Sequence, residues 1–333
     1  MSYLYVVDDG ATLSVDGGYY VVHYKNGDTR KIPSETLESV ALFGNISVTT
    51  PCVKKFLENG IAVSYFSKKG AYFGRLESTR HTNIFRLKKQ IHLSDNLHFK
   101  VPLAQKIISA KINNQAVVLA RYERSTGIDV TYERFMMHDS MEKSKKAETI
   151  AEIMGHEGNA AKYYFQGLSK VVNPDFNFSG RTRMPPKDAF NSMLSLGYTM
   201  IMYEIYGEIE NKGLSPYAGF IHSDKERHPT LASDLMEEWR AVIIDSVVMS
   251  LVNGKEISPC DFITDEESGG VFILNAGMTK FIKKFEEKLR SETGYINSSY
   301  KMSFRKALWH QVNRLVSAIE AEDPYLYDPI IIR

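Results

Sequence analysis

The pattern of apolar residues changes from strand-like runs to a 3.6-residue helical repeat near residue 84, and this change constrains the fold more than any other feature of the chain. Before it, runs rich in Val and Tyr at 3–7 and 19–24 predict strands. Asp16-Gly17-Gly18 and Asn26-Gly27 predict hairpin turns, because glycine and asparagine tolerate a positive φ. The other elements predicted here are strands at 61–67 and 71–75 and short helices at 34–38 and 51–58.

The helical repeat begins at Leu103, includes Ile107, Ile108 and Ile112, and continues with interruptions to about residue 320. A chain of 333 residues is long enough for two domains. We therefore predict an α+β protein, with a small β-rich N-terminal domain followed by a larger all-helical domain. The predicted boundaries are 1–84 for the β-rich domain, 85–102 for a linker and 103–333 for the helical domain.

The composition is typical of a soluble globular protein, with 43% hydrophobic and 24% charged residues. No uncharged apolar stretch reaches the roughly 18 residues that a membrane-spanning helix needs, and the first residues lack the basic and long apolar regions of a signal peptide. We therefore expect a cytoplasmic protein. Cys52 and Cys260 lie far apart, without Cys or His at metal-ligand spacing, so we expect two reduced thiols.

Positive charge is concentrated between Lys68 and Ser125, although the whole chain carries only +1. This segment has twelve basic and three acidic residues, a net charge of +9, which leaves −8 for the rest of the chain. Such an asymmetry can provide a surface that follows the phosphates of a nucleic acid. A solvated helical surface gives the same pattern, so the segment alone does not establish a DNA partner.

Several common catalytic motifs are absent from the sequence. Gly254-Lys255-Glu256 lacks the hydroxyl residue that follows the lysine of a nucleotide-binding phosphate loop. His156-Glu157 begins like a zinc-protease motif, but Ala160 stands where the second histidine would be. No Gly-x-Ser-x-Gly nucleophile motif occurs. These absences leave zinc hydrolysis and nucleotide-driven chemistry without support.

One acid and one histidine lie in unusual sequence settings. Glu157 is surrounded by the small residues of 155–161, which would let a ligand or another backbone approach closely. An acid favoured by the dipole at a helix start would give the same pattern. His222 follows the segment 219–221, and a hydrogen-bonded core histidine is the alternative there to a metal ligand.

Three further acids follow shortly after His222. Asp234, Glu237 and Glu238 are spaced i, i+3 and i+4, so all three can share one helix face. Their charges repel unless a cation or a basic surface neutralises them, although a solvated acidic turn is also compatible with this spacing. Carboxylates and an imidazole from separate segments form a ligand set that suits Mg²⁺ or Mn²⁺, with positions left for water and phosphate oxygens.

A series of motifs extends over nearly the whole chain. In the β-rich part they are Ile32-Pro33, Leu42-Phe43-Gly44 and Gly60-Ile61-Ala62-Val63. In the helical part they are Lys111-Ile112-x-Asn114-Gln115, Glu157-Gly158-x-Ala160-Ala161-x-x-Tyr164, Arg181-x-Arg183-x-Pro185-Pro186-x-Asp188 with Asn191, Gly213-Leu214-x-Pro216-Tyr217-x-Gly219-Phe220-x-His222, Asp234-Leu235-Met236-Glu237-Glu238 with Arg240, and Tyr327-x-Pro329. In this order and spacing, the chain resembles the CRISPR-associated integrase family, the nuclease subunit of spacer acquisition.

The resemblance implies that the β-rich domain mediates dimerisation and that the helical domain is catalytic. It also implies one Mg²⁺ or Mn²⁺ site held by Glu157, His222 and Glu237, with Asp234 as a supporting or alternative ligand. All of these ligand positions are retained in the sequence. Our candidates for contacts to DNA phosphates are Arg75, Arg86, Lys111 and Arg183.

The implied activity is that of a metal-dependent DNA endonuclease and integrase of CRISPR adaptation. The 3′-hydroxyl ends of protospacer DNA would be joined to the CRISPR repeat by transesterification, and water as the nucleophile would cut DNA instead. The implied partners are double-stranded DNA, a second copy of the chain and a small ferredoxin-like adaptation protein. Two alternatives remain at this point, namely a non-catalytic DNA-binding scaffold of the same complex and a small-molecule metal hydrolase.

Overall fold

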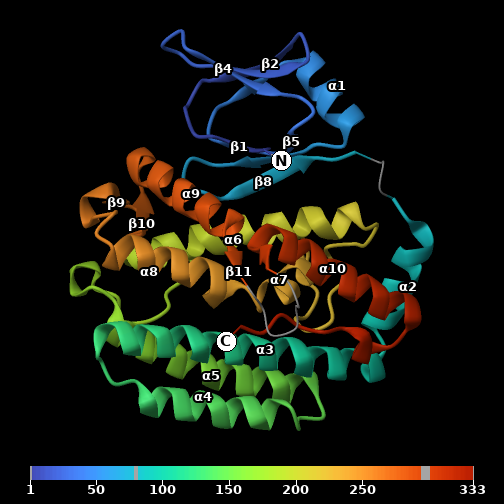
Figure 1. Ribbon diagram of the computed structural model, residues 1–333, viewed down its shortest axis with the longest axis vertical. Coiled ribbons are helices and arrows are strands. Elements are labelled where there is room, and N and C mark those ends of the chain that lie inside the picture. The colour runs from blue at the N-terminus through green and yellow to red at the C-terminus, as the bar shows by residue number, and fades with distance from the viewer. Residues whose placement is uncertain (1, 79–81, 294–300, 333) are drawn as a thin grey trace. The chain divides into compact units, whose positions relative to one another are not determined.

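The computed structural model of the chain describes residues 2–78, 82–293 and 301–332. It divides into two compact units, Met1–His81 and Thr82–Arg333 (Figure 1). The first unit is β-rich and the second is mainly helical, so the predicted α+β class and the order of its two parts are confirmed. Arg80, one of the basic residues counted in the sequence, lies outside the described residues.

The N-terminal unit consists of two four-stranded sheets and one helix. Its elements are β1 (Ser2–Val6), β2 (Thr12–Asp16), β3 (Tyr19–His23), β4 (Thr29–Pro33), β5 (Leu37–Phe43), β6 (Ser47–Val48), α1 (Thr50–Asn59), β7 (Ala62–Phe66) and β8 (Tyr72–Leu76). In the sheet β1-β5-β7-β8, β5 pairs in parallel with β1 and β7, and β8 is antiparallel to β7. In the sheet β4-β3-β2-β6, turns at Gly17-Gly18 and Asn26-Gly27 join antiparallel strands, which confirms both predicted hairpins.

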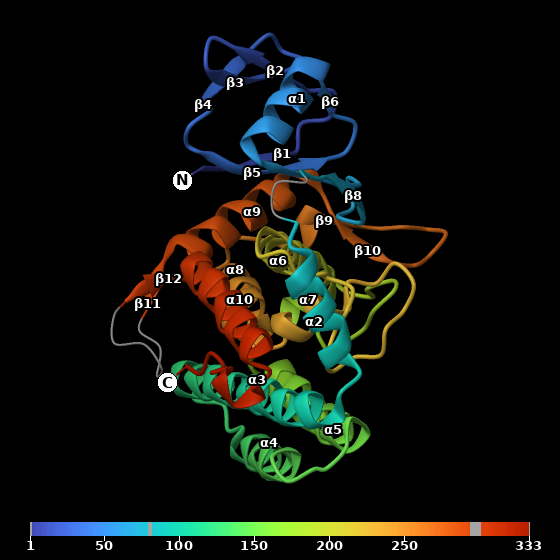
Figure 2. The ribbon, with the colours of Figure 1, turned by 90° about the vertical axis from the view of Figure 1, so that its right-hand side faces the viewer.

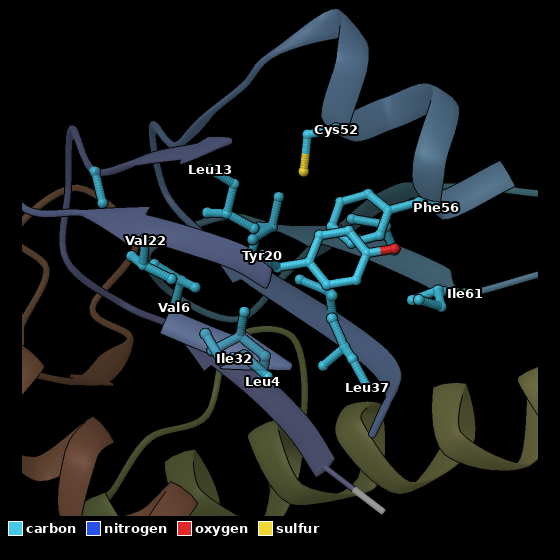
Figure 3. Packing of buried hydrophobic residues seen from close by; sticks show 14 residues of the cluster. Leu4, Val6, Leu13, Tyr20, Val22, Ile32, Leu37, Cys52, Phe56 and Ile61 are labelled. Carbon is cyan, nitrogen blue, oxygen red and sulfur yellow. The ribbon is translucent and has the colours of Figure 1, made fainter. Parts of the chain in front are cut away.

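Side chains from both sheets and from α1 form one hydrophobic core in this unit (Figure 3). Tyr20 of β3 stacks on Phe56 of α1, with the ring centroids 4.6 Å apart. Leu37 is buried in the same core, and the short helix predicted at 34–38 is wrong: residues 34–36 form a turn and β5 begins at Leu37. Pairing with a strand distant in the sequence overrides the local helical preference there.

The C-terminal unit is mainly helical, but it is not all-helical as predicted, because it also contains two short antiparallel strand pairs. Its α-helices are α2 (Ile84–Ser94), α3 (Leu97–Thr126), α4 (Thr131–Ser144), α5 (Ile150–Val171), α6 (Ala189–Asn211), α7 (Thr230–Met236), α8 (Ser246–Asn253), α9 (Asn275–Arg290) and α10 (Phe304–Ala321). Its shorter elements are the π-helical turn η3 (Arg240–Asp245), the 3-10 turns η2 (Pro174–Phe176), η4 (Pro259–Asp261) and η5 (Pro324–Leu326), and the strands β9 (Phe262–Thr264), β10 (Val271–Ile273), β11 (Glu292–Thr293) and β12 (Met302–Ser303). Within the described ranges, no helix combines the length and the hydrophobicity that crossing a membrane requires.

Residues 85–102 do not form the predicted linker, because nearly all of them belong to α2 and to the first turns of α3. Asn83 begins α2 by accepting a backbone N–H of its first turn at 3.1 Å. The buried side chain of Gln90 donates to the carbonyl oxygens of Ser215 and Ala218 at 2.7 and 2.8 Å. This segment is therefore a packed part of the helical unit, fixed by partners that lie far away in the sequence.

Helices α3, α4 and α5 lie side by side in the C-terminal unit (Figures 1 and 2). Gly167 allows α5 to approach α3 closely, because a Cβ atom at this position would lie only 2.6 Å from Leu119 Cδ2. The close packing matters for the site described below, since α3 carries Lys111 and α5 carries Glu157.

Buried hydrogen bonds fix the C-terminal segment that follows α10. Glu238 accepts the Tyr327 hydroxyl at 2.5 Å and the Ile330 N–H at 2.8 Å. Asn114 of α3 donates to the carbonyl oxygen of Ile330 at 2.9 Å and accepts the Ile332 N–H at 3.0 Å. Burial raises the pKa of Glu238 to about 7, although these hydrogen bonds act in the opposite direction. Glu238 thus attaches the C-terminal segment to the body of the helical unit.

Candidate metal centre

The three predicted metal ligands come from three separate segments of the helical unit. Glu157 lies on α5, His222 lies in the loop between α6 and α7, and Glu237 directly follows the last residue of α7. His222 Nε2 is 3.8 Å from Glu237 Oε1. Glu157 and Glu237 contact the same ammonium group, which belongs to Lys111. The tertiary structure therefore gathers the three side chains around one position.

Lys111 lies between the two carboxylates. Its side chain is 6% exposed, and its Nζ contacts Glu157 Oε1 and is 2.6 Å from Glu237 Oε2. From the sequence we expected Lys111 to contact a phosphate, and we did not predict this ion pair. A signal was available, because Lys111 occupies an apolar position in the helical repeat that includes Ile107 and Ile108.

The buried carboxylate of Asp234 determines the shape of the loop that carries His222. Its Oδ2 accepts the backbone N–H groups of Phe220 and Ile221 at 2.6 and 3.0 Å. Its Oδ1 accepts the His222 N–H at 3.1 Å and is 2.7 Å from His222 Nδ1. Gly219 permits this close approach, because a Cβ atom there would lie 2.7 Å from Asp234 Oδ2. With both oxygens engaged in this way, Asp234 orients the loop and the imidazole.

The contact with Asp234 also selects the tautomer of His222. A carboxylate beside Nδ1 favours a proton on that nitrogen, which leaves the lone pair of Nε2 on the side of Glu237. Burial by itself lowers the pKa of His222, but the charges of Asp234 and Glu237 outweigh burial and raise the pKa above its ordinary value. Histidines that bind metals typically donate one ring N–H to a carboxylate and bind the metal through the other ring nitrogen, and the ring of His222 is oriented for this arrangement.

Glu237 is ionised although it is almost fully buried. Burial raises the pKa of this carboxyl group, but the positive charges of Arg240 and Lys111, and of His222 when its ring is protonated, outweigh it and lower the pKa to about 2. Arg240 Nη2 is 3.1 Å from Glu237 Oε1, whereas Lys111 contacts the other carboxylate oxygen, Oε2. The site thus contains a fixed negative charge near neutral pH.

The three neighbouring acids of this segment have different principal partners, although Asp234 and Glu237 both lie beside the His222 ring. Asp234 binds the loop of His222, Glu237 faces Lys111, and Glu238 binds the C-terminal segment. The regular α-helix ends at Met236, and the chain continues through a turn into the π-helical residues Arg240–Asp245. Single π-helical turns occur frequently at functional sites. Asp234 and Glu237 are grouped around His222 as the spacing predicts, whereas Glu238 binds the C-terminal segment.

A further buried acid, Asp245, lies at the end of the π-helical turn. Asp245 accepts the hydroxyls of Tyr164 and Tyr198 at 2.7 and 2.6 Å, and burial raises its pKa to about 6. The guanidinium of Arg240 lies 4.8 Å from the centroid of the Tyr198 ring. This cluster holds Arg240 in place beside Glu237. We did not predict it from the sequence, although Tyr164 and Arg240 both belong to the motifs.

The candidate phosphate-binding residues have different environments. Arg75 lies on β8 with its side chain 7% exposed, and its Nε is 3.7 Å from a carboxylate oxygen of Glu77. Arg86 of α2 pairs with Glu320 of α10 at 2.5 Å. Arg183, in the loop before α6, is exposed. Among the four candidates, Arg183 is therefore the one whose side chain is most open to solvent.

The donor set fits a divalent cation. Two carboxylates and an imidazole nitrogen are ligands that Mg²⁺ and Mn²⁺ accept, and a positively charged ammonium already lies between the carboxylates. Glu237 Oε2 is buried, and it lies beside Lys111 without a well-aligned hydrogen bond. This oxygen is therefore suited to a metal ion, whose attraction does not depend on the direction of a donor hydrogen. As the side chains stand in the described part of the chain, Lys111 separates the ligands, and no three His, Cys, Asp or Glu residues are close enough to enclose an ion.

Sequence comparisons identify relatives across nearly the whole chain. A family profile described as "CRISPR associated protein Cas1" matches residues 4–287. The "CRISPR-associated endonuclease Cas1" of Mycobacterium tuberculosis strain H37Rv is 35% identical over 325 residues, which are 97% of this chain and 96% of that protein. Glu157, His222 and Glu237 all lie within the range that the family profile matches.

Solved structures with the same fold extend the comparison. A "Casposase bound to integration product" has a TM-score of 0.85 at 22% identity, and the match covers 97% of this chain and 92% of that one. A chain of a "Cas6-RT-Cas1--Cas2 complex" has a TM-score of 0.83 at 24% identity, and the match covers 98% of this chain and 36% of that one. At these identities the structures establish a shared fold.

We expect Asp234→Asn to lower the pKa of His222, because a neutral amide replaces the carboxylate that stabilises the protonated ring. NMR titration of the His222 ring protons in metal-free protein measures this change, and His222→Ala assigns the signal. Glu238→Gln is the matched control, since it neutralises a neighbouring acid that faces the C-terminal segment instead. An unchanged pKa of His222 in Asp234→Asn would contradict the role of Asp234.

Proposed function

Since the chain belongs to the CRISPR-associated protein Cas1 family, we propose that it is a metal-dependent DNA endonuclease and integrase of CRISPR adaptation. One observation carries the proposal: Glu157, His222 and Glu237 converge around a buried position that already holds a positive charge. The relative named an endonuclease matches 97% of the chain, so the converging residues belong to the shared region.

Glu157, His222 and Glu237 would hold Mg²⁺ or Mn²⁺ in this proposal. The bound ion supplies positive charge that stabilises the oxygen leaving the attacked phosphate. Asp234 keeps the free ring nitrogen of His222 directed toward Glu237, and Arg240 fixes one oxygen of Glu237. These supporting contacts preorganise the ligands, which lowers the cost of reaching the reactive geometry.

The proposed joining reaction exchanges one phosphodiester for another. The 3′-hydroxyl of protospacer DNA attacks a phosphate of the CRISPR repeat, a new P–O bond forms and the bond to the former 3′-oxygen breaks. Because the number of phosphodiesters is conserved, no nucleotide hydrolysis is required, in agreement with a sequence that lacks a phosphate loop. Attack by water instead cuts the strand. The casposase of the same fold, solved bound to an integration product, supports this choice of reaction.

Replacing any proposed ligand should abolish the chemistry and spare DNA binding. We expect Glu157→Gln, His222→Ala and Glu237→Gln to lower Mn²⁺-dependent strand joining and cutting by about 100-fold or more. Gel assays on branched and repeat DNA measure both activities, with EDTA as the metal-free reference. Glu152→Gln provides the matched control, because it makes the same change at an exposed position of α5.

The same variants separate an enzyme from a DNA-binding scaffold or a small-molecule hydrolase. A scaffold would bind duplex DNA in wild type and variants alike without metal-dependent joining or cutting. A small-molecule hydrolase would show no duplex binding that weakens with salt. Full strand joining by His222→Ala would eliminate the proposed site.

The proposal also includes an electrostatic contact between Arg183 and a DNA phosphate. We expect Arg183→Ala to weaken duplex binding and to reduce the slope of log K against log salt concentration by about 0.9. Binding titrations at several salt concentrations measure this slope. Arg86→Ala should instead lower thermal stability and leave the slope unchanged, because Arg86 pairs with Glu320 inside the helical unit. An unaltered slope in Arg183→Ala would remove Arg183 from the DNA surface.

We further propose that the chain forms a homodimer through its β-rich unit and binds a small ferredoxin-like adaptation protein. The family membership supports both proposals, and one solved assembly that contains the same fold is named a Cas6-RT-Cas1--Cas2 complex. Light scattering of the full chain at micromolar concentration should give the mass of two chains. A strict monomer under these conditions would rule out the dimer.

A further inference from the structure

Lys111 lies where a cation bound by Glu157 and Glu237 would lie. Its ammonium contacts Glu157 Oε1 and is 2.6 Å from Glu237 Oε2, and the exposed fractions of the three side chains are 6%, 15% and 3%. An ammonium removed from water is costly unless opposite charges surround it. The two carboxylates meet that requirement, and they would repel each other if the ammonium were absent.

The two carboxylates that Lys111 contacts are balanced by two cations without a metal ion. Lys111 and Arg240 oppose Glu157 and Glu237, and the two cations contact different oxygens of Glu237. Adding a divalent ion between the same carboxylates would give these four groups and the ion a net charge of +2, which the nearby buried carboxylate of Asp234 lowers only to +1, with like charges a few ångströms apart. The ion and the Lys111 ammonium therefore compete for the same place.

We propose that Lys111 is a built-in counter-ion, which holds Glu157 and Glu237 together in the metal-free protein and leaves when the metal binds. This inference rests on the metal site of the proposed function. Lysine suits the task, because a compact ammonium on a flexible four-carbon stem can move without a change in the backbone. Arg240 does not suit it, since its guanidinium is held over the ring of Tyr198.

The proposal makes Lys111 a residue that tunes metal affinity. While the ammonium occupies the site, the carboxylates stay close to each other and the surrounding helices stay packed. The metal must displace an existing ion pair, so its affinity is lower than the same ligands would give without the lysine. Removing the charge should therefore strengthen metal binding and weaken the metal-free protein.

The test compares Mn²⁺ binding to full-length wild type and Lys111→Met, measured by calorimetry and by electron paramagnetic resonance of free Mn²⁺. We expect Lys111→Met to lower the Kd for Mn²⁺ at least tenfold. We also expect its melting temperature to fall in the absence of metal and to recover when Mn²⁺ is added. Lys111→Gln, whose amide can still donate to both carboxylates, allows the same comparison if the methionine variant does not fold.

Two control variants keep or remove a positive charge without opening the site. Lys111→Arg keeps the charge and should bind Mn²⁺ no more tightly than wild type. Lys106→Met removes a lysine from the same helix, where it donates to carbonyl oxygens of the C-terminal segment instead of to the carboxylates. It should leave the Kd for Mn²⁺ unchanged, and Mn²⁺ should not restore any loss of its melting temperature.

A further variant distinguishes failure of this inference from failure of the metal site. Glu157→Gln should weaken Mn²⁺ binding at least tenfold, alone and combined with Lys111→Met. If it does so while Lys111→Met binds Mn²⁺ no more tightly than wild type, the counter-ion role is overturned and the metal site stands. If Glu157→Gln changes Mn²⁺ binding in neither background, the ion binds elsewhere and both proposals are overturned.

Discussion

A charge removed from water must meet an opposite charge, and this constraint organises the helical unit around Glu237. The buried carboxylate receives Lys111 from α3 on one oxygen and Arg240 from the π-helical turn on the other. Because Lys111 also contacts Glu157, the same ion pairs bring α5 to the end of α7. The two carboxylates in these ion pairs are therefore also two of the three proposed metal ligands.

Three neighbouring acids at the end of α7 have different roles because each meets different partners. Regular α-helix through Glu238 would place Asp234, Glu237 and Glu238 on one side, where their charges would repel. The helix instead ends at Met236, and a turn at residues 237–239 leads into the π-helical residues. One acid shapes a loop, the second belongs to the candidate metal centre, and the third attaches the C-terminal segment.

The basic segment illustrates how a charge count and a charged surface differ. Between Lys68 and Ser125 the net charge is +9, a value that is compatible with binding to phosphates. Many of these cations have partners within the protein: Lys89 pairs with Glu322 at 3.0 Å, and Lys106 donates to two carbonyl oxygens of the C-terminal segment at 2.7 Å. Positive charge used in this way stabilises the packing of the helices and is partly unavailable to DNA.

Features that depend on neighbours in the chain follow from the sequence by itself: the hairpin turns, the helical repeat, the order of the two units and, through ordered motifs, the family. Features that depend on distant partners were decided only by the tertiary structure. The helical state of residues 85–102 depends on Gln90 and its contacts with the loop before α7. The burial of Lys111 depends on Glu157 and Glu237, which lie on other elements. Local preferences set turns and helices within a few residues, whereas the pairing of buried charges requires folding to bring separate segments together.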